Sequence, residues 1–293
     1  MTPVDKGSDC NISLPESGLT EHAVYLDSKS SEITELYLDE LYDELQKIVH
    51  LWKEKNIAKS YLVLGTEKWG KAAVQAVPFK EAKSSVYRNF QQLQVLYRFV
   101  FGGYLPTQDR AARFRHIYRD LTLEKTNVEA SKIGRVSNCV FCESRVLDSQ
   151  RVLEGKQVEV LYNYAPLGLG GERIHFLIVP KRHCKGFSEL TKEEHREAYL
   201  VANYVSEKLK CYYEKEGSKI QNVYTYHKSG LDAGQSVFHF HLHLVMTQNR
   251  ADELFGKLAV ARNILFGLFP LSKEELEEKR RKYASILATK SIS

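Results

Sequence analysis

The sequence predicts an α+β fold, in which a sheet with packed helices follows an N-terminal α/β region. Short apolar segments of strand length recur between residues 157 and 246. A capping box formed by Thr191 and Glu194 begins a long helix among these segments, extending to about residue 214. Other strand and helix patterns precede residue 135, and 293 residues suffice for one large domain or two ordinary ones.

The N-terminal part divides into an expected tail and an expected α/β region. Residues 1–30 are polar and lack periodicity, which predicts a loosely packed tail, and residues 31–135 form the α/β region. Its expected elements are a helix from Ser31, strands at 60–65 and 72–79, a helix over roughly 82–101 that ends at Gly102–Gly103, and a basic helix over 107–119. The polar stretch EKTNVEASKIGRVSN marks a boundary near residue 135.

The second half contains four expected strands and a C-terminal helical segment. The strands lie at 157–164, 173–180 and 222–230 and in the stretch GQSVFHFHLHLVM, and the helical segment covers residues 251–293. The first two strands are joined through the glycine-rich LGLGGE. The strand-loop-strand-helix order of 60–101 is similar to that of 157–214, so the N-terminal region is either a degenerate repeat or a chance likeness.

Composition predicts a cytoplasmic protein without a membrane partner. The net charge is +5, no apolar run reaches 18 residues, and the N-terminus has no signal-peptide pattern. Five scattered cysteines fit a reducing compartment. The local Arg and Lys clusters are interpreted as solvated helix faces, so nucleic acid is not indicated as a partner.

Three histidines alternate with large apolar residues in the stretch GQSVFHFHLHLVM. In a strand, His239, His241 and His243 would share one face, spaced roughly 6.5–7 Å apart. The apolar residues between them would face the core. The alternative is an exposed strand that carries histidine incidentally, but Lys, Thr or Glu would serve equally well there. The pattern therefore favours a functional site.

A histidine in this position can act as a nucleophile. Neutral imidazole is competent near neutral pH, and its attack on phosphorus gives a covalent phosphoramidate. His243 lies next to His241 on the expected face, and Gln235 and Ser236 supply amide and hydroxyl donors just before the strand. Gly234 permits the close backbone approach that a phosphate site requires.

The stretch CVFC places Cys139 and Cys142 in a CxxC spacing with three interpretations. They are half of a zinc site, a redox pair or two unrelated buried thiols. The thioredoxin-like context of a redox pair is missing. A structural zinc site needs two further ligands, for which the candidates are His183 and one histidine of the triplet.

Together these segments resemble the histidine triad (HIT) superfamily of nucleotide hydrolases and transferases. HFHLHLV is similar to the family signature, AGQS to its lead-in, and PLGLGGERIHFLIVPKRH to its upstream segment. CVFC is similar to the CxxC of zinc-bearing members. The resemblance covers about residues 135–250, and it implies an HIT-like catalytic domain over 136–250 with an antiparallel sheet.

The resemblance also implies residue roles. His241 matches the nucleophile that becomes nucleotidylated, His243 the histidine that contacts phosphate, and His175 the upstream active-site histidine. Asn163 matches a ribose-binding position, and Gln235 and Ser236 match positions near the phosphate and leaving group. A structural Zn²⁺ is implied, with ligands that match Cys139, Cys142, His183 and His239.

The chain departs from the family pattern before the lead-in. HKSG stands where many members have an Asn-rich stretch, so Lys228 replaces the usual amide as the candidate phosphate contact. The galactose-phosphate uridylyltransferase branch usually has Gln at the third histidine, and His243 argues against that branch.

The sequence therefore predicts an enzyme, a nucleotide hydrolase or nucleotidyl transferase that cleaves at the α-phosphate through a nucleotidyl-histidine on His241. Nucleoside phosphoramidates, dinucleoside polyphosphates and similar conjugates are candidate substrates. The alternative is a zinc-stabilised nucleotide-binding or scaffold protein in which catalysis is vestigial. The resemblance also implies a homodimer, or an intramolecular pseudo-dimer if the N-terminal region is a degenerate repeat.

Overall fold

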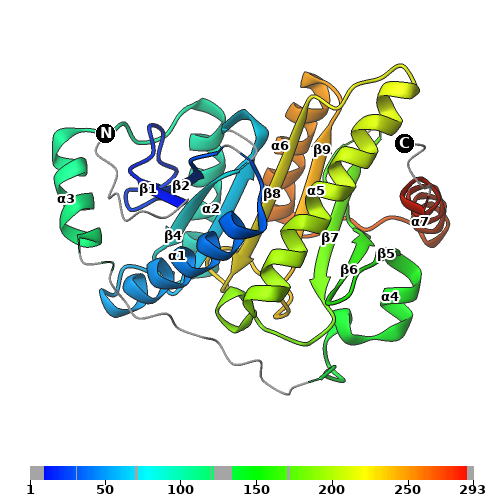
Figure 1. The fold of residues 1–293 in the computed structure, drawn as a ribbon, viewed down its shortest axis with the longest axis horizontal. Coiled ribbons are helices and arrows are strands. Elements are labelled where there is room, and N and C mark those ends of the chain that lie inside the picture. Colours follow the sequence, from blue (N-terminus) through cyan, green and yellow to red (C-terminus); the bar gives the residue numbers. More distant parts are fainter. Residues whose placement is uncertain are drawn as a thin grey trace. The chain divides into compact units, whose positions relative to one another are not determined.

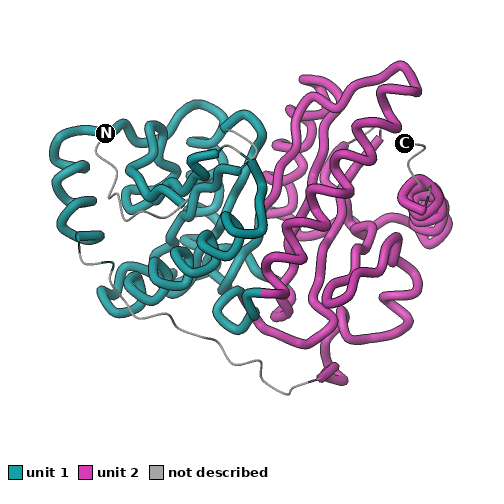
Figure 2. The backbone as a smooth tube through the Cα atoms, in the orientation of Figure 1, with its two compact units in different colours: residues 1–130, 187–192, 226–236 teal, residues 131–186, 193–225, 237–293 magenta. Residues whose placement is uncertain are grey.

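The computed structural model describes residues 10–30, 32–69, 72–119, 121, 134–169 and 172–288 (Figure 1). The described residues form seven α-helices and nine strands, which confirms the α+β class. The chain divides into two compact units, shown separately coloured in Figure 2. Unit 1 comprises Met1–Ala130, Phe187–Lys192 and Tyr226–Ser236, and unit 2 comprises Ser131–Gly186, Glu193–Thr225 and Val237–Ser293.

Unit 1 contains an antiparallel sheet with strand order β1-β2-β4-β3. Its elements are β1 (Cys10–Ser13), β2 (Val24–Ser28), α1 (Glu35–Glu54), β3 (Ser60–Thr66), β4 (Ala73–Phe79), α2 (Ser85–Phe101) and α3 (Gln108–Tyr118). The Thr34 side chain caps α1 by accepting a hydrogen bond from the Tyr37 amide. α2 ends at Gly102, whose positive φ of 104° is readily adopted by glycine but rarely by other residues. The expected strands and helices of 31–119 are thus confirmed.

The two faces of the unit 1 sheet are covered by different helices. Trp52 of α1 packs on Tyr61 of β3, with ring centroids 6.2 Å apart. Leu64 and Val77 point to the opposite face, where they join a core cluster with Val95 of α2. Every residue of β4 is buried, as expected of a strand that is covered on both faces.

The tail expected over residues 1–30 is wrong for the part that the structure describes, and residues 1–9 lie outside that part. β1 pairs with β2, and β2 pairs with β4 in the register Val24↔Ala76. In β2, Val24 and Leu26 are fully buried while Tyr25 and Asp27 are half-buried. This alternation is the period-two pattern of a strand, but five residues are too few to stand out in a polar segment.

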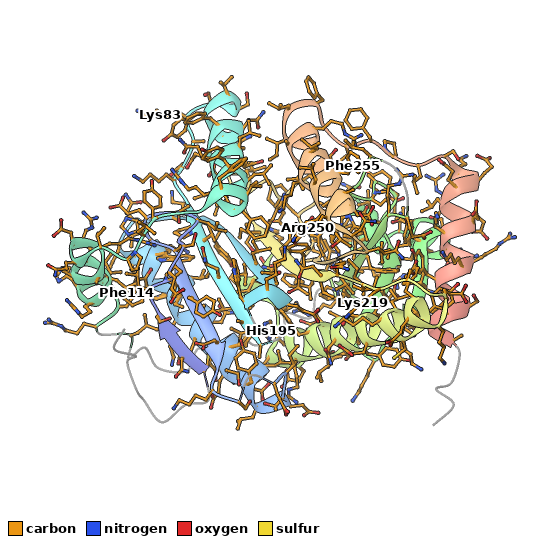
Figure 3. All side chains as sticks on the ribbon, turned by 90° about the horizontal axis from the view of Figure 1, so that it is seen from above. Lys83, Phe114, His195, Lys219, Arg250 and Phe255 are labelled. Carbon is orange, nitrogen blue, oxygen red and sulfur yellow. The ribbon has the colours of Figure 1, made fainter. Side chains whose placement is uncertain are left out.

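Unit 2 contains an antiparallel sheet that ends in β9-β7-β6-β5. Its elements are α4 (Ser144–Gln150), β5 (Arg151–Glu154), β6 (Val158–Tyr162), β7 (Ile174–Pro180), most of α5 (Lys192–Lys215), the first half of β8 (Asn222–Ser229), β9 (Leu242–Thr247), α6 (Arg250–Phe266) and α7 (Lys273–Ala288). β8 lies beside β9 in the strand order. Figure 3 labels His195 near the start of α5 and Lys219 just beyond its end.

The two units share a topology. β1, β2, α1, β3 and β4 follow one another as β6, β7, α5, β8 and β9 do. Their spatial orders, β1-β2-β4-β3 and β6-β7-β9-β8, also correspond. The repeat therefore matches residues 10–79 with 158–247, and the alignment of 60–101 with 157–214 expected from the sequence is wrong. That alignment was misplaced because it left out β1 and β2.

None of the helices in the described ranges combines the length and apolarity needed to cross a membrane.

Candidate functional site

The histidine segment is only partly a strand. β9 begins at Leu242, so His243 lies in the strand while His239 and His241 precede it. The Phe240 amide donates to the Cys184 carbonyl at 2.6 Å, outside the β7–β9 ladder. The expectation of three histidines in one strand is therefore wrong. The expectation for the intervening residues is right, since Phe240, Leu242 and Leu244 are fully buried.

The backbone fixes the protonation of the His241 ring. His241 is 7 % exposed, and its Nδ1 lies 2.7 Å from the His239 carbonyl oxygen. A carbonyl only accepts, so Nδ1 carries the proton and donates it to this bond. In the neutral ring the lone pair then lies on Nε2. This is the nitrogen that can attack an electrophile.

His175 and His243 form a direct hydrogen bond between neighbouring strands. The His175 Nε2 to His243 Nδ1 distance is 2.9 Å, and the Leu167 amide donates to His175 Nδ1 at 3.1 Å. Because His175 Nδ1 accepts, its Nε2 bears the hydrogen and donates to His243. His243 Nε2 then carries the hydrogen of its own ring. These bonds therefore fix which nitrogen of each ring carries the hydrogen.

Asn163 supports the same pair from the end of β6. Its Nδ2 lies 3.3 Å from each ring nitrogen of His175, and its Oδ1 accepts from the Ala165 amide at 3.1 Å. The side chain is buried at 7 % exposure. The structure thus brings together Asn163, His175 and His243, and the ring centroids of His241 and His243 are 4.9 Å apart.

Four potential metal ligands meet beside this histidine group. The ligand atoms of Cys139, Cys142, His183 and His239 all lie within 4.8 Å of one another. His239 Nδ1 is 3.3 Å from the Sγ of Cys139 and 3.7 Å from that of Cys142. His183 Nδ1 is 3.7 Å from the Sγ of Cys142.

These distances and donor types fit a tetrahedral metal ion. Zinc bonds of about 2.0–2.3 Å at tetrahedral angles separate sulfur and nitrogen ligands by about 3.5 Å. His239 Nε2 donates to the Pro180 carbonyl at 3.0 Å, which turns the Nδ1 lone pair toward the thiols. Burial lowers the pKa of His239 to about 4 and raises that of the Cys139 thiol to about 11. A cation would offset this cost by stabilising the thiolate.

Phe141 links the cysteine–histidine group to His241, and sequence reasoning missed it. Its ring lies 5.8 Å from that of His239 in an edge-on arrangement and 5.3 Å from that of His241. It also joins a buried cluster with Leu177 and Val179 of β7. Its place within the CVFC stretch was the available signal. The Leu167 amide and the Pro180 carbonyl were missed as well, because backbone groups have no sequence signature.

The phosphate candidates of the lead-in belong to unit 1. Gly234 has a φ of 82°, and the Gln235 side chain accepts from the Gly230 amide at 2.8 Å. That carboxamide oxygen therefore helps close a turn. Ser236 is exposed, and the Nζ of Lys228 lies 5.9 Å from the Tyr226 ring centroid. Their roles toward phosphate stay predictions.

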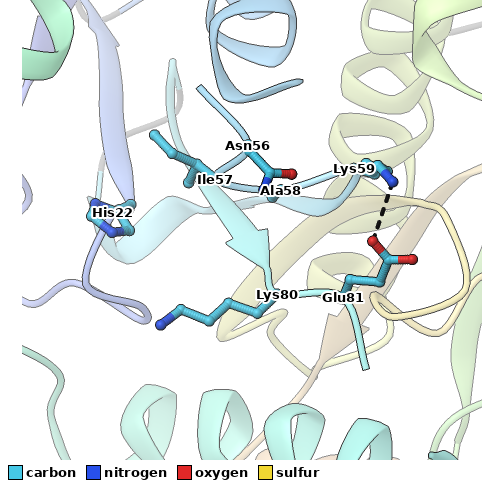
Figure 4. Close-up of a pocket in the computed structure, with 7 residues that line it drawn as sticks. All are labelled: His22, Asn56, Ile57, Ala58, Lys59, Lys80 and Glu81. Carbon is cyan, nitrogen blue, oxygen red and sulfur yellow. Dashed lines mark hydrogen bonds and ion pairs between the residues drawn. The ribbon is translucent and has the colours of Figure 1, made fainter. Parts of the chain in front are cut away.

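A pocket of about 350 Å³ also lies in unit 1, and none of the predicted site residues lines it (Figure 4). Its lining includes His22, Asn56 and Lys80. Lys59 and Glu81 form an ion pair at 3.2 Å on its rim.

Comparison with known proteins establishes the family. The model of the HIT domain matches residues 144–250. An uncharacterized HIT-like protein of Mycoplasma genitalium is 31% identical over 111 residues, which cover 37% of this chain and 72% of that protein. The chain belongs to the HIT family. "Protein hit" of Bacillus subtilis is 27% identical over 117 residues, covering 39% of this chain and 74% of that protein.

Two further matches of this HIT protein carry functional names. The bis(5'-adenosyl)-triphosphatase of Dictyostelium discoideum is 27% identical over 109 residues, covering 36% of this chain and 66% of that protein. A solved uridylyltransferase structure has a TM-score of 0.51 and 13% identity, covering 92% of this chain and 76% of that chain. The second match shows a similar fold that extends well beyond the HIT domain.

Proposed function

We propose that this protein cleaves a nucleotide conjugate at its α-phosphate, as a hydrolase or nucleotidyl transferase, through a covalent intermediate on His241. The observation that carries the proposal is the bond from His241 Nδ1–H to the His239 carbonyl, which leaves Nε2 as the nucleophile. The triphosphatase of Dictyostelium discoideum, a relative by sequence, supports a substrate of the dinucleoside polyphosphate class. Nucleoside phosphoramidates present the same α-phosphorus and are the second class.

In the first step, Nε2 of His241 forms a bond to the α-phosphorus, and the bond to the leaving group breaks. The leaving group takes that electron pair and a proton from solvent. In the second step, water or another acceptor attacks the same phosphorus and gives up its proton to solvent. The phosphorus–nitrogen bond breaks, and its electron pair returns to Nε2, which restores the neutral imidazole. The Nε2–H of His243, held by its bond from His175, is the donor toward a non-bridging oxygen. Asn163 is the proposed ribose contact.

We further propose that the metal bound by the cysteine–histidine group is Zn²⁺ and that its role is structural. Two thiolates and two imidazoles fill a tetrahedral zinc ion and leave no position for substrate. The four residues Cys139, Cys142, His183 and His239 would fasten the start of unit 2 to the segment that carries His241.

The test is turnover by the wild type and by His241→Ala on a panel of adenylated and guanylated conjugates. We expect release of nucleoside monophosphate from at least one conjugate, and loss of activity in the variant by more than about 10⁴-fold. A covalent nucleophile contributes more than the roughly 10²–10⁴-fold of acid–base assistance. Mass spectrometry of rapidly quenched wild type should find one acid-labile nucleotidyl group.

His50→Ala is the matched control, because His50 is an exposed histidine of α1 paired with Glu54. It should retain full activity. Retention of more than about a tenth of the activity by His241→Ala would contradict the covalent mechanism. Nucleotide binding without turnover by the wild type would instead support the vestigial alternative.

A further inference from the structure

The C-terminal segment fastens both arms of the loop between β6 and β7. On the first arm, the Leu271 amide donates to the Tyr164 carbonyl at 2.8 Å. On the second arm, Glu172 accepts a hydrogen bond from the Tyr283 hydroxyl of α7 at 2.6 Å. The segment lies outside the match to the HIT domain, which ends at residue 250.

Glu172, which precedes β7, is contacted by charged and polar side chains of α7. Lys279 and Lys282 place their ammonium groups 3.3 and 3.1 Å from its carboxylate oxygens. Burial works against the charged form of Glu172, but the Tyr283 bond and the two lysines outweigh it and hold the pKa of this carboxyl below its ordinary value. The carboxylate thus stays ionised and bonded to α7.

Tyr283 also packs α7 against the sheet. The residue is fully buried, its ring stacks on Tyr162 of β6 with centroids 5.3 Å apart, and it meets Phe176 of β7 edge-on at 5.0 Å. The Tyr213 hydroxyl of α5 lies 3.2 Å from its own hydroxyl. The donor to Glu172 therefore has a fixed position.

The fastened loop carries the groups that orient His175. Glu172 precedes His175 by three residues along the chain, at the entry to β7. Tyr164 precedes Leu167, whose amide bonds to His175 Nδ1, by three residues on the other arm. The Tyr162 hydroxyl also donates to the Arg173 carbonyl at 2.6 Å, which ties the end of β6 to the residue after Glu172.

We infer that α7 positions the His175–His243 pair through this loop, with Tyr283 and Glu172 as positioning residues that touch no substrate. The inference rests on the proposed function for its effect on turnover. When the loop is held, the Leu167 amide keeps His175 in the tautomer whose Nε2–H donates to His243. When the hold is lost, His175 samples both tautomers, and the His243 donor loses its fixed direction.

The experiment compares Tyr283→Phe and Glu172→Gln with the wild type in full-length, metal-loaded protein. Tyr283→Phe keeps the aromatic stack and removes the donor, and Glu172→Gln keeps the size of the acceptor and removes its charge. We expect kcat to fall by about tenfold in each variant with a smaller change in KM, because the lost orientation acts on the transition state. Nitrogen-15 NMR of the imidazoles should change from one Nε2–H tautomer at His175 to a mixture.

Leu287→Ala is the control for a merely structural role of α7. Leu287 is 2 % exposed, and its truncation loosens the helix without removing a bond to Glu172. We expect this variant to be less stable than Tyr283→Phe but to keep the wild-type kcat and the single His175 tautomer. An unchanged tautomer in both test variants, or an equal loss of kcat in Leu287→Ala, would overturn the inference.

The NMR comparison needs no substrate. If the wild type turned over none of the conjugates, the proposed function would fail. The His175 tautomer would still decide whether α7 positions this pair.

Discussion

Unit 1 and unit 2 share a strand order, but they differ in the side chains that occupy one face of their sheets. In unit 2, the face of β7 and β9 that carries His175 and His243 also carries Leu177, which packs beside the cysteines. In unit 1, the face of β3 and β4 turned away from α1 is filled by α2. In unit 2 this face carries two histidines, and in unit 1 it carries mainly buried apolar side chains.

Gln75 shows how the unit 1 face is closed. It lies on β4 opposite Leu64 and is 2 % exposed. Its Oε1 accepts from the Leu19 amide at 2.8 Å, and its Nε2 donates to the Ser17 carbonyl at 3.2 Å. The Gln75 side chain thus provides hydrogen-bond partners for the backbone of residues 17–19, which lie over this face of the sheet. A shared topology therefore does not imply a shared site, because the site depends on which side chains occupy that topology.

Metal removal is expected to produce the largest difference between the units. We predict about one zinc ion per chain in protein purified without a polyhistidine tag. Because structural zinc contributes on the order of 10 kcal/mol in small domains, chelation should strongly increase hydrogen exchange around Cys139 and His239. The only two tryptophans, Trp52 and Trp69, lie in unit 1, so their fluorescence should change little.

The matched variants for this prediction are Cys139→Ser and Cys211→Ser. Cys211 is exposed and lies outside the ligand group, so its variant should keep the metal. Cys139→Ser should lose most of it. A zinc content near zero in the wild type would refute the prediction.

The sequence predicted the elements whose patterns are long or have clear ends. The helix that became α2 was expected to end at Gly102–Gly103, and the strands that became β3 and β4 lie on either side of the TEKWGK turn. β1 and β2 were not predicted, because their four- and five-residue segments include polar residues and lie in a mainly polar stretch, where the alternation of a strand does not stand out. The local pattern therefore indicated the long helices and the central strands, but not β1 and β2 of unit 1 or the short α4 and β5 of unit 2.

For the candidate site, the sequence indicated residue types but not the backbone geometry. Type and spacing indicated His241 and His243, and the resemblance to the HIT superfamily indicated His175. They did not indicate that β9 begins only after His241, because the Phe240 amide bonds to the carbonyl of Cys184, which lies far away in the sequence. The role of α7 was equally hidden, since Glu172 and Tyr283 are 111 residues apart in sequence.

Gln75→Leu should destabilise unit 1 without affecting catalysis. The substitution leaves the buried Leu19 amide without its acceptor, which costs about 1–3 kcal/mol. Denaturant unfolding followed by tryptophan fluorescence measures this loss, because Trp69 packs on the same core cluster. The value of kcat should remain that of the wild type.

Gln91→Leu is the comparison for Gln75→Leu. Gln91 also bonds to a backbone amide and carbonyl, both of Lys80, but these bonds are exposed to solvent. Its loss should cost less than about 0.5 kcal/mol. A fall in kcat for Gln75→Leu near that of His241→Ala would mean that the unit 1 face takes part in the reaction.

Lys228 is expected to give the smallest effect, and it is a partly buried charged residue of unit 1. Burial lowers the pKa of its ammonium group from 10.5 to about 8. Below pH 8 the folded and unfolded states both hold the proton, so the full cost of the buried charge is present. Between pH 8 and 10.5 the unfolded state binds more protons, so stability rises with pH and the cost is relieved.

Lys228→Met should therefore be more stable than the wild type below pH 8, by about 1–2 kcal/mol after solvent screening, with the advantage shrinking as pH rises to 10.5. Denaturant unfolding of both proteins across this range measures the difference, and subtraction removes the contribution of the tyrosines. If the stability difference between Lys228→Met and the wild type did not depend on pH, the pKa of Lys228 would not be lowered. The sequence also predicts that Lys228 contacts phosphate. Lys228→Met should then raise KM for nucleotide conjugates while leaving kcat nearly unchanged. An unchanged KM would contradict the predicted contact between Lys228 and phosphate.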